Sequence, residues 1–480
     1  MDGRMICGGH FSELFCKNRE DYEMNIGKKE VNMLSGPIAS GLLKIAIPIM
    51  VMNVIQSLFN IVDMSILKMF DTDGGYAVGS VGACGTLISL ITGLLIGVST
   101  GANVIIARHI GKGDKEGVDR AIGTAMLFSV AGGVALMIIG ISFAEVFLGW
   151  VNCPDALLEG ATLYFRLYFA GVPILMIYNF CASILRSSGD SRRPMIYLTL
   201  GGIVKVTLTY VFVGAFDMAI KGVAYATIIS WSVSAILGVV TLLKSDGSVK
   251  IKMRHVRFYK RELKEILYIG VPAGLQQALY SIANVIIAAT VNSFGKDATT
   301  GISIANNFDS IMYQICMATS IAVMPYVSQN VGNGNIKRAT QSISRGIVIT
   351  VALGAFFGSL SAIFSTQLAS IMSDNPAVIA YARQKMVLIS STYFICGINE
   401  IMGAALRGMG KPIISTISTL IYMCAFRFVW VYAIFPFYKN LTFLYLVWPI
   451  GWALSIITLL FFYFPTVKQL KAKFPKGEHA

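Results

Sequence analysis

Long apolar stretches alternate with short polar segments along nearly the whole chain. Each stretch reaches the roughly 20 residues that a helix needs to cross the hydrocarbon core of a bilayer. A helix satisfies its backbone hydrogen bonds within one segment, so the pattern predicts an all-α membrane protein. The twelve predicted spans lie near residues 40–68, 76–107, 121–149, 160–185, 194–216, 219–243, 263–294, 299–330, 343–372, 385–407, 412–437 and 441–466.

Basic residues gather in every second polar segment. With the N-terminal tail placed in the cytoplasm, 30 of the 39 Lys and Arg lie on that side, 7 lie on the other side, and Lys205 and Arg427 fall within spans. Membrane proteins concentrate Lys and Arg in their cytoplasmic segments. The asymmetry predicts twelve crossings with both termini in the cytoplasm. The seven residues assigned to the outer side are Lys68, Arg166, Lys221, Lys296, Arg383, Lys385 and Lys439.

The composition excludes a soluble protein. Of the 480 residues, 55% are hydrophobic and 13% are charged, against about 25% charged in soluble domains. The net charge of +14 is explained by the cytoplasmic segments, so no nucleic-acid partner is expected. The eight cysteines are dispersed without a Cys-x-x-Cys motif and the four histidines lie outside the spans, so we expect no metal site, no cofactor and no catalytic site.

The two halves of the chain resemble each other. Pro48 and Pro272 are 224 positions apart, as are Asn60 and Asn284, and the segments 110–113 and 331–334 are 221 apart. Six spans per copy make the copies parallel repeats, an arrangement in which transporters place a substrate site between two lobes. The predicted organisation is a tail (1–39), an N-lobe (40–243), a basic linker (244–262), a C-lobe (263–466) and a second tail (467–480).

Several duplicated motifs carry a resemblance to one transporter family. The chain resembles the multidrug and toxic compound extrusion (MATE) family through motifs at 47–48 and 58–63, at 111–113, at 185–189, at 270–274 and at 406–410. The resemblance implies two six-helix lobes related by a pseudo-two-fold axis along the membrane normal. It also implies a secondary active antiporter of the bacterial inner membrane that exports amphipathic, often cationic organic compounds by alternating access, in exchange for protons or sodium. We expect a monomer.

Two other functions are compatible with a membrane protein of this size. A lipid-linked saccharide flippase of the wider superfamily would carry a strongly charged central cavity and often extra spans. The second alternative is a membrane-embedded enzyme or a scaffold without transport, and the absence of paired catalytic groups at depth argues against it. The few intramembrane charges favour the antiporter.

Five ionisable residues fall within the predicted spans. A charge at the centre of a bilayer costs about 2.5 kcal/mol or more, so each is a candidate for ion coupling. A buried carboxylate can exchange a proton for another cation because desolvation and neighbouring charges shift its proton affinity in opposite directions. The candidates are Asp63, Lys205, Asp309, Glu400 and Arg427.

In the first lobe, the resemblance places a cation-binding aspartate at Asp63. It also implies an Asn on the fifth span and a Thr on the sixth; the Thr is kept as Thr227, whereas Lys205 replaces the Asn and Thr209 offers a second polar group. An ammonium beside a carboxylate competes with sodium. We therefore predict an Asp63–Lys205 ion pair that is either proton-coupled or structural. In the alternative, Lys205 snorkels or pairs elsewhere.

In the second lobe, Glu400 stands 221 positions after Asn179, so the lobes differ in charge. The resemblance makes Glu400 a cation-site candidate, and Asp309 and Arg427 could pair with it or with each other. A buried salt bridge that serves specificity alone explains Asp309 and Arg427 equally well.

Amides recur at helical spacing on the first and seventh spans. Such a face can coordinate polar ligands, or it can join helices by hydrogen bonds. The candidates for the substrate cavity are Asn53, Gln56, Asn60, Asn179, Gln276, Gln277, Tyr280 and Asn284.

Overall fold

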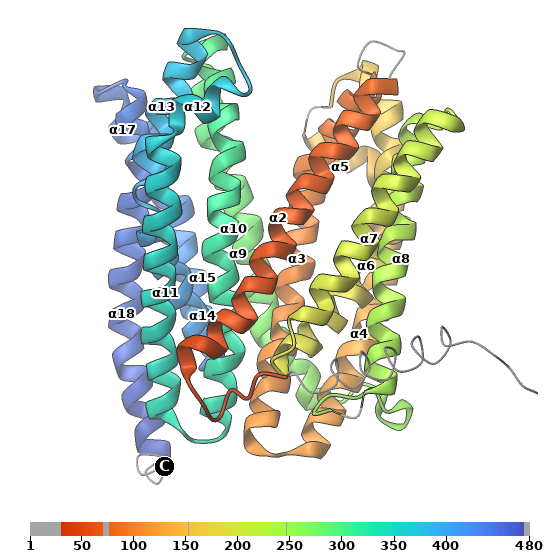
Figure 1. The fold of residues 1–480 in the computed structure, drawn as a ribbon, viewed down its shortest axis with the longest axis vertical. Helices are drawn as coiled ribbons and strands as arrows, with labels where there is room; N and C mark the ends of the chain where they lie inside the picture. Colours follow the sequence, from red (N-terminus) through yellow and green to blue (C-terminus); the bar gives the residue numbers. More distant parts are fainter. Residues whose placement is uncertain (1–29, 71–75, 152, 246, 475–480) are drawn as a thin grey trace, which may run out of the picture.

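The computed structural model describes residues 30–70, 76–151, 153–245 and 247–474, and every regular element within these ranges is a helix. Figure 1 shows two helical bundles that approach each other at the lower end and diverge toward the upper end. The described chain begins and ends at the lower end, where the linker between the lobes also lies, and we call this the linker end; the upper end is called the open end. The predicted all-α, two-lobe fold is confirmed.

The N-lobe is formed by the first part of the chain. Three of its connections are short turns, and a short helix lies at the open end between the third and fourth spans. Its elements are α2 (Ile38–Phe70), α3 (Tyr76–Lys112), α4 (Lys115–Ser142), α5 (Ala144–Trp150), α6 (Asp155–Ser187), α7 (Arg192–Tyr210), the π-helix η1 (Val211–Ala215) and α8 (Ala219–Lys244).

The C-lobe follows the linker, which contains the short 3-10 helix η2 (Met253–His255). Its eleventh span alternates between α and π geometry. Its elements are α9 (Lys260–Asn292), α10 (Lys296–Gly332), α11 (Ile336–Ile363), α12 (Ser365–Ser370), α13 (Pro376–Ser390), α14 (Tyr393–Gly408), α15 (Pro412–Thr419), η3 (Leu420–Ala425), α16 (Phe426–Val429), η4 (Trp430–Ile434), η5 (Phe435–Phe437), α17 (Leu441–Tyr445) and α18 (Val447–Lys473).

The tenth span differs from its prediction. Eleven helical segments of the described chain are long and apolar enough to cross a membrane. The pair α13 and α14, which covers the predicted tenth span and is bent by 48°, meets the same criterion of length and apolarity when the two helices are taken together. Hydropathy placed its start at residue 385, but α13 begins at Pro376, where Asn375 caps the helix by accepting a hydrogen bond from Ala377 N. Polar residues in α13, Lys385 among them, delay the hydropathy signal although Lys385 is buried.

The repeat is visible in the turns at the linker end. Gly113 and Gly334 end α3 and α10 with φ of 71° and 78°, and Gly189 and Gly410 follow α6 and α14 with φ of 96° and 84°. Only glycine adopts these angles without strain. Both pairs are 221 positions apart, so the duplicated glycine motifs encode the same turns twice.

The first helix of each half crosses from one bundle to the other. Near the linker end, α2 packs Leu42, Ile45 and Ile49 into a core with α10 and α11, whereas its other half packs along α7. Likewise α9 packs Ile266 and Ile269 against the core of the N-lobe, then joins the C-lobe toward the open end. Figure 1 shows α2 running diagonally between the bundles. Motion of one lobe against the other must therefore involve α2 and α9.

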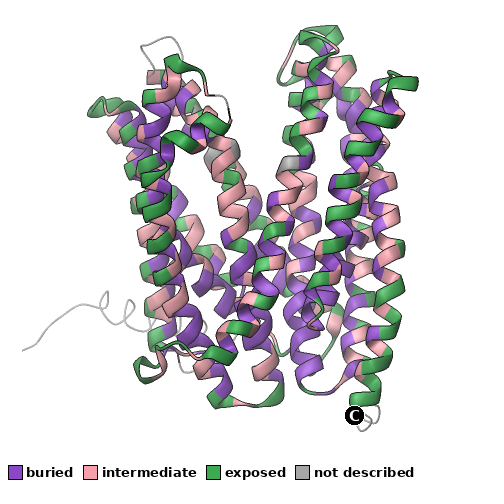
Figure 2. Cartoon of the chain, turned by 180° about the vertical axis from the view of Figure 1, so that it is seen from behind, coloured by how far each residue is buried: buried purple, intermediate pink, exposed green. Residues whose placement is uncertain are grey.

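The lobes are joined tightly in the linker half. A Cβ atom added to Gly97 of α3 would lie 2.2 Å from Gly274 Cα of α9, so the two backbones touch. Ser328 Oγ donates to Val104 O at 3.0 Å, and Gln329 Nε2 donates to Ser187 O at 2.7 Å, each across the lobe boundary. Figure 2 shows buried residues gathered where the bundles meet in the lower half. The linker end is closed in this structure.

Candidate functional site

The N-lobe candidates form a compact ion pair. Lys205 Nζ of α7 contacts Asp63 Oδ2 of α2, and Thr209 Oγ1 of α7 donates to Asp63 Oδ1 at 3.2 Å. Asp63 is 4% exposed. The predicted Asp63–Lys205 contact is confirmed. Because Lys205 lies one helical turn from Thr209, both side chains reach the carboxylate from the same face of α7.

Thr227 does not join this pair. Its hydroxyl donates to Val223 O within α8 at 2.8 Å. A Thr that bonds the carbonyl four residues earlier uses its only proton within its own helix. The ligand set around Asp63 is therefore supplied by α7.

The C-lobe holds a second ion pair. Lys385 Nζ of α13 lies 2.8 Å from Asp309 Oδ2 of α10 and also contacts Asn306 Oδ1. The side chains of Lys385 and Asp309 are 5% and 11% exposed. The assignment of Lys385 to an outer loop is wrong, because the tenth span starts nine residues earlier than its hydropathy suggests and carries Lys385 into the bundle.

Arg427 of α16 is fully buried and has neutral neighbours. Its Nη1 donates to Asn284 Oδ1 of α9 at 2.7 Å. Its guanidinium lies 5.6 Å from the ring centre of Tyr280 and 5.3 Å from that of Trp448, both cation–π distances. The Nε atom is buried without a hydrogen-bond partner.

The predicted pairing of Asp309, Arg427 and Glu400 with one another is wrong. Asp309 binds Lys385 and Arg427 binds Asn284. Glu400 instead lies beside Arg407 of its own helix, α14, and Tyr313 of α10. The partner of each buried charge depends on which helices meet at its depth in the bundle. The sign of the charge alone does not indicate that partner.

A cavity of about 420 Å³ opens between α9, α10, α13 and α18 in the open half of the C-lobe. Three predicted residues, Gln277, Tyr280 and Asn284, line it. The Asp309–Lys385 pair forms part of its wall. Its aromatic lining consists of Tyr280, Tyr313, Tyr393, Tyr445, Trp448 and Trp452.

A smaller cavity of about 50 Å³ lies closer to the linker end, between α3, α9 and α10. Glu400, Arg407 and the predicted Gln276 line it. Arg407 Nη1 donates to Gln276 Oε1 at 2.9 Å and to Ser415 Oγ at 3.0 Å. This polar cluster lies where α9 passes from the N-lobe core into the C-lobe.

Three further residues predicted to line the substrate cavity, Asn53, Gln56 and Asn179, are not among the residues that line these two cavities. Asn53 is buried and Gln56 is exposed on α2, and Asn179 Nδ2 of α6 donates to Leu175 O at 2.9 Å. The side chain of Asn60 is outside the described part of the chain. The amide face of α9 thus reaches a cavity that the described amides of α2, Asn53 and Gln56, do not line.

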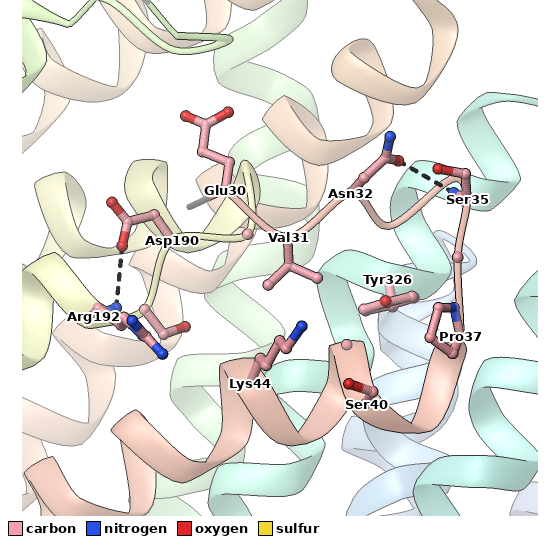
Figure 3. Close-up of a pocket in the computed structure, with 14 residues that line it drawn as sticks. Glu30, Val31, Asn32, Ser35, Pro37, Ser40, Lys44, Asp190, Arg192 and Tyr326 are labelled. Atoms are coloured by element: carbon pink, nitrogen blue, oxygen red, sulfur yellow. Dashed lines mark hydrogen bonds between the residues drawn. The ribbon is translucent and has the colours of Figure 1, made fainter. Parts of the chain in front are cut away.

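A third cavity, of about 390 Å³, lies at the linker end. Figure 3 shows Glu30 and Asp190 on neighbouring segments above Lys44 and Ser40 of α2. Residues 30–36, which we call the bridging segment, cross between the lobes, and Arg338 of α11 donates to Met33 O, Ser35 O and Gly36 O.

Both carboxyl groups of this cavity are perturbed. Burial raises the pKa of Glu30, and the nearby carboxylate of Asp190 raises it further. Burial also raises the pKa of Asp190, although Arg193 and backbone N–H groups act in the opposite direction. A lower pH therefore favours this closed arrangement.

Sequence reasoning missed Lys385, Arg407 and, apart from Tyr280, the aromatic lining of the C-lobe cavity. Lys385 and Arg407 were counted as loop cations because each stands near a polar segment. A signal existed for Arg407, since its motif is duplicated at Arg186 and both arginines occupy a last helical turn. No periodicity in the sequence distinguishes the aromatic residues that line this cavity from those that pack elsewhere.

The comparisons with known proteins agree with this architecture. The family model MatE matches residues 48–211 and 272–433, one copy in each half. The probable multidrug resistance protein YpnP of Bacillus subtilis is 24% identical over 83% of this chain and 89% of its own length. The FAD transporter of Shewanella oneidensis is 24% identical over 82% of this chain and 87% of its own length.

Solved structures share the fold. A MOP superfamily transporter from Pyrococcus furiosus, described as having a binding pocket of reverse polarity that suggests a different function, superimposes with a TM-score of 0.85, 23% identity, and coverage of 92% of this chain and 99% of its own. An outward-facing multidrug resistance MATE transporter superimposes with a TM-score of 0.85 and 22% identity, and the match covers 93% of this chain and 99% of that one. With two family matches on two duplicated lobes, the chain belongs to the MATE family of membrane transporters.

Proposed function

We propose that this protein is a secondary active antiporter that exports amphipathic organic molecules in exchange for protons, by alternating access. The observation that carries the proposal is that the two lobes are hydrogen-bonded to each other in the linker half, while a cavity opens in the open half. Rocking the lobes about their contact would close the open end and expose the path at the linker end. The two lobes of one chain supply both walls of this path, so we propose a monomer.

We propose Asp63 as the coupling residue. Lys205 occupies one oxygen of its carboxylate and Thr209 donates to the other, so the site holds a tethered cation in place of a free one. Sodium would have to displace an ammonium that cannot diffuse away. A proton needs no such space, because it neutralises Asp63 and releases Lys205.

The orientation is proposed from charge. The linker and both ends of the described chain lie at one end, and residues 244–264 there carry eight Lys and Arg. Cytoplasmic segments of membrane proteins are rich in these residues. We therefore propose a cell-membrane location with the linker end in the cytoplasm, and no catalytic activity or cofactor beyond the coupling ion.

The experiment is dye transport in proteoliposomes under one imposed ion gradient at a time. We expect the wild type to work on a proton gradient and not on a sodium gradient. Lys205→Asn should gain sodium-driven transport, because it removes the tethered cation. Lys221→Asn, which removes an exposed charge from the first turn of α8, is the matched control and should behave as wild type. Sodium-driven transport by the wild type would refute proton coupling.

A further inference from the structure

The C-lobe cavity has one more positive charge around it than its acidic groups balance. Among the described residues that line it, Asp309 is the one acid and Lys385 the one base, and they neutralise each other at 2.8 Å. Arg427 lies directly behind the wall formed by Asn284, Tyr280 and Trp448. Glu400 also lies behind the wall, beside Tyr313, but it is accompanied there by Arg407 of its own helix. A guanidinium stays protonated in proteins, so the charge of Arg427 is left over.

The repeat shows where the missing carboxylate would be. Pro194 and Pro412, like Val211 and Val429, are 218 positions apart, and this spacing aligns Thr209 with Arg427. In the N-lobe, Thr209 bonds Asp63 on the first span. At the offset of 224 that relates the first and seventh spans, the C-lobe counterpart of Asp63 is Ile287, a residue of the cavity wall. The C-lobe therefore has the cation Arg427 where the N-lobe has the hydroxyl of Thr209. It also has the apolar Ile287 where the N-lobe has the acid Asp63.

The two cations also orient the amides of the wall. Arg and Lys side chains are donors only, so Asn284 turns its carbonyl oxygen to Arg427 and Asn306 turns its own to Lys385. The NH₂ groups of both amides are left as donors. Tyr280 accepts a hydrogen bond from Trp452 Nε1 at 3.4 Å, which leaves its O–H proton as a further donor.

The remaining lining is aromatic. Trp448 lies 5.3 Å from the Arg427 guanidinium and 5.7 Å from Lys385 Nζ, so one indole ring is shared by both cations. An aromatic ring that already contacts a cation on one face attracts a second cation less strongly on its other face. That other face can still stack on a planar apolar part of a ligand. A cavity of about 420 Å³ has the size of sites for drug-sized molecules.

We propose that this cavity selects an aromatic organic anion, such as an amphipathic carboxylate, with its acidic group at Asn284 and Tyr280 in the field of Arg427. The inference rests on the proposed export function and gives its substrate class. It differs from the cationic substrates that the family resemblance led us to expect. An organic cation in the same place would meet the uncompensated charge of Arg427 across a single layer of side chains.

The test compares two dyes of opposite charge on one fused-ring skeleton. Fluorescein is an anion near neutral pH, and a rhodamine ester is a cation. Their binding is measured by fluorescence anisotropy with the purified full-length protein in nanodiscs of zwitterionic lipid, without any ion gradient. We expect fluorescein to bind at least about tenfold more tightly. Because no transport occurs, failure of the export proposal in proteoliposomes leaves this result independent.

Two variants test the role of Arg427. Asn284→Asp places a carboxylate 2.7 Å from Arg427 without changing the shape of the side chain, so it should cancel the surplus charge and reduce the fluorescein preference at least about tenfold. Arg427→Gln removes the charge and should act in the same direction; if it does not fold, Asn284→Asp still decides. Arg383→Gln removes an exposed charge from α13, the helix of Lys385, and should leave both affinities unchanged.

Four outcomes would overturn the proposal, three of them in the wild type or in Asn284→Asp. These are equal or tighter binding of the rhodamine ester by the wild type, an unchanged dye preference in folded Asn284→Asp, and the absence of binding of either dye. Loss of the preference in Arg383→Gln as well would also refute it, because the selectivity would then come from the overall surface charge.

Discussion

The two lobes have related sequences but treat buried charge differently. In the N-lobe, Asp63 is met by Lys205 and Thr209, and the site is electrically neutral. In the C-lobe, Asp309 and Lys385 neutralise each other while Arg427 has only neutral partners. Duplication therefore preserved the helices and turns, and the charges diverged. This difference is the basis of our proposals that the first lobe couples transport to an ion and that the second lobe selects the substrate.

Breaking each ion pair should separate the lobes most clearly. Asp309→Leu leaves Lys385 uncompensated with a side chain only 5% exposed, and such a change costs about 3–5 kcal/mol. Asp63→Leu should cost less, because the Lys205 side chain is 17% exposed and can gain water. Thermal unfolding in detergent measures both.

The double variant Asp309→Leu with Lys385→Met is the control for that experiment. It replaces the whole buried pair by apolar groups, which is often neutral for stability. A double variant as unstable as Asp309→Leu alone would show that the carboxylate acts through other contacts.

Two contacts between helices of different lobes offer a second comparison: α3 meets α9 at Gly97, and α2 meets α10 at Gly41. Gly97→Ala should separate α3 from α9, because its Cβ would lie 2.2 Å from backbone atoms of Gly274. We expect a loss of about 1–3 kcal/mol and a longer distance between spin labels at Lys115→Cys and Lys337→Cys. Gly41→Ala in the opposite crossing should cost less, since its Cβ meets the ring end of Tyr326, which borders the cavity of about 390 Å³.

Gly85→Ala is the matched control on α3. A Cβ at Gly85 has no other atom within 4 Å, and alanine favours a helix by about 1 kcal/mol over glycine. Its spin-label distance should equal that of the wild type. If Gly85→Ala opened the linker end as much as Gly97→Ala, the close backbone contact would not be what holds the lobes together.

The smallest expected effect is that of pH on the closed linker end. The raised pKa values of Glu30 and Asp190 mean that this arrangement binds protons more readily than one with both carboxyl groups in water. Its stability is therefore greatest below their ordinary pKa values and declines as pH rises through the raised values.

The same spin-label pair measures this effect. The shorter distance should be more populated at acidic pH, by less than about 1 kcal/mol for each carboxyl. Glu30→Gln should reduce the pH dependence, whereas Glu145→Gln at the open end should not change it. A pH response that is identical in Glu30→Gln and wild type would exclude Glu30 as the titrating group.

Much of the fold could be predicted from the sequence, because spanning is a local property. Twenty apolar residues must form a helix in lipid whatever surrounds them, and the glycines at 113, 189, 334 and 410 specify their turns by backbone sterics alone. The Asp63–Lys205 contact could also be predicted, since two opposite charges stood on spans that the family resemblance placed together. These features depend on one segment or on one known pairing.

Only the tertiary structure decided the partners in the C-lobe. Lys385 reaches Asp309 because α13 begins early and bends into α14, and Arg427 reaches Asn284 because α9 crosses from one lobe to the other. The cavity, its aromatic wall and the closed linker end follow from how helices distant in sequence cross. The sequence determined which segments span the membrane and placed five ionisable residues within them. The packing added Lys385 and Arg407 to the buried charges and determined which charges are neutralised, because a side chain can pair only with the group that the fold brings within hydrogen-bond distance.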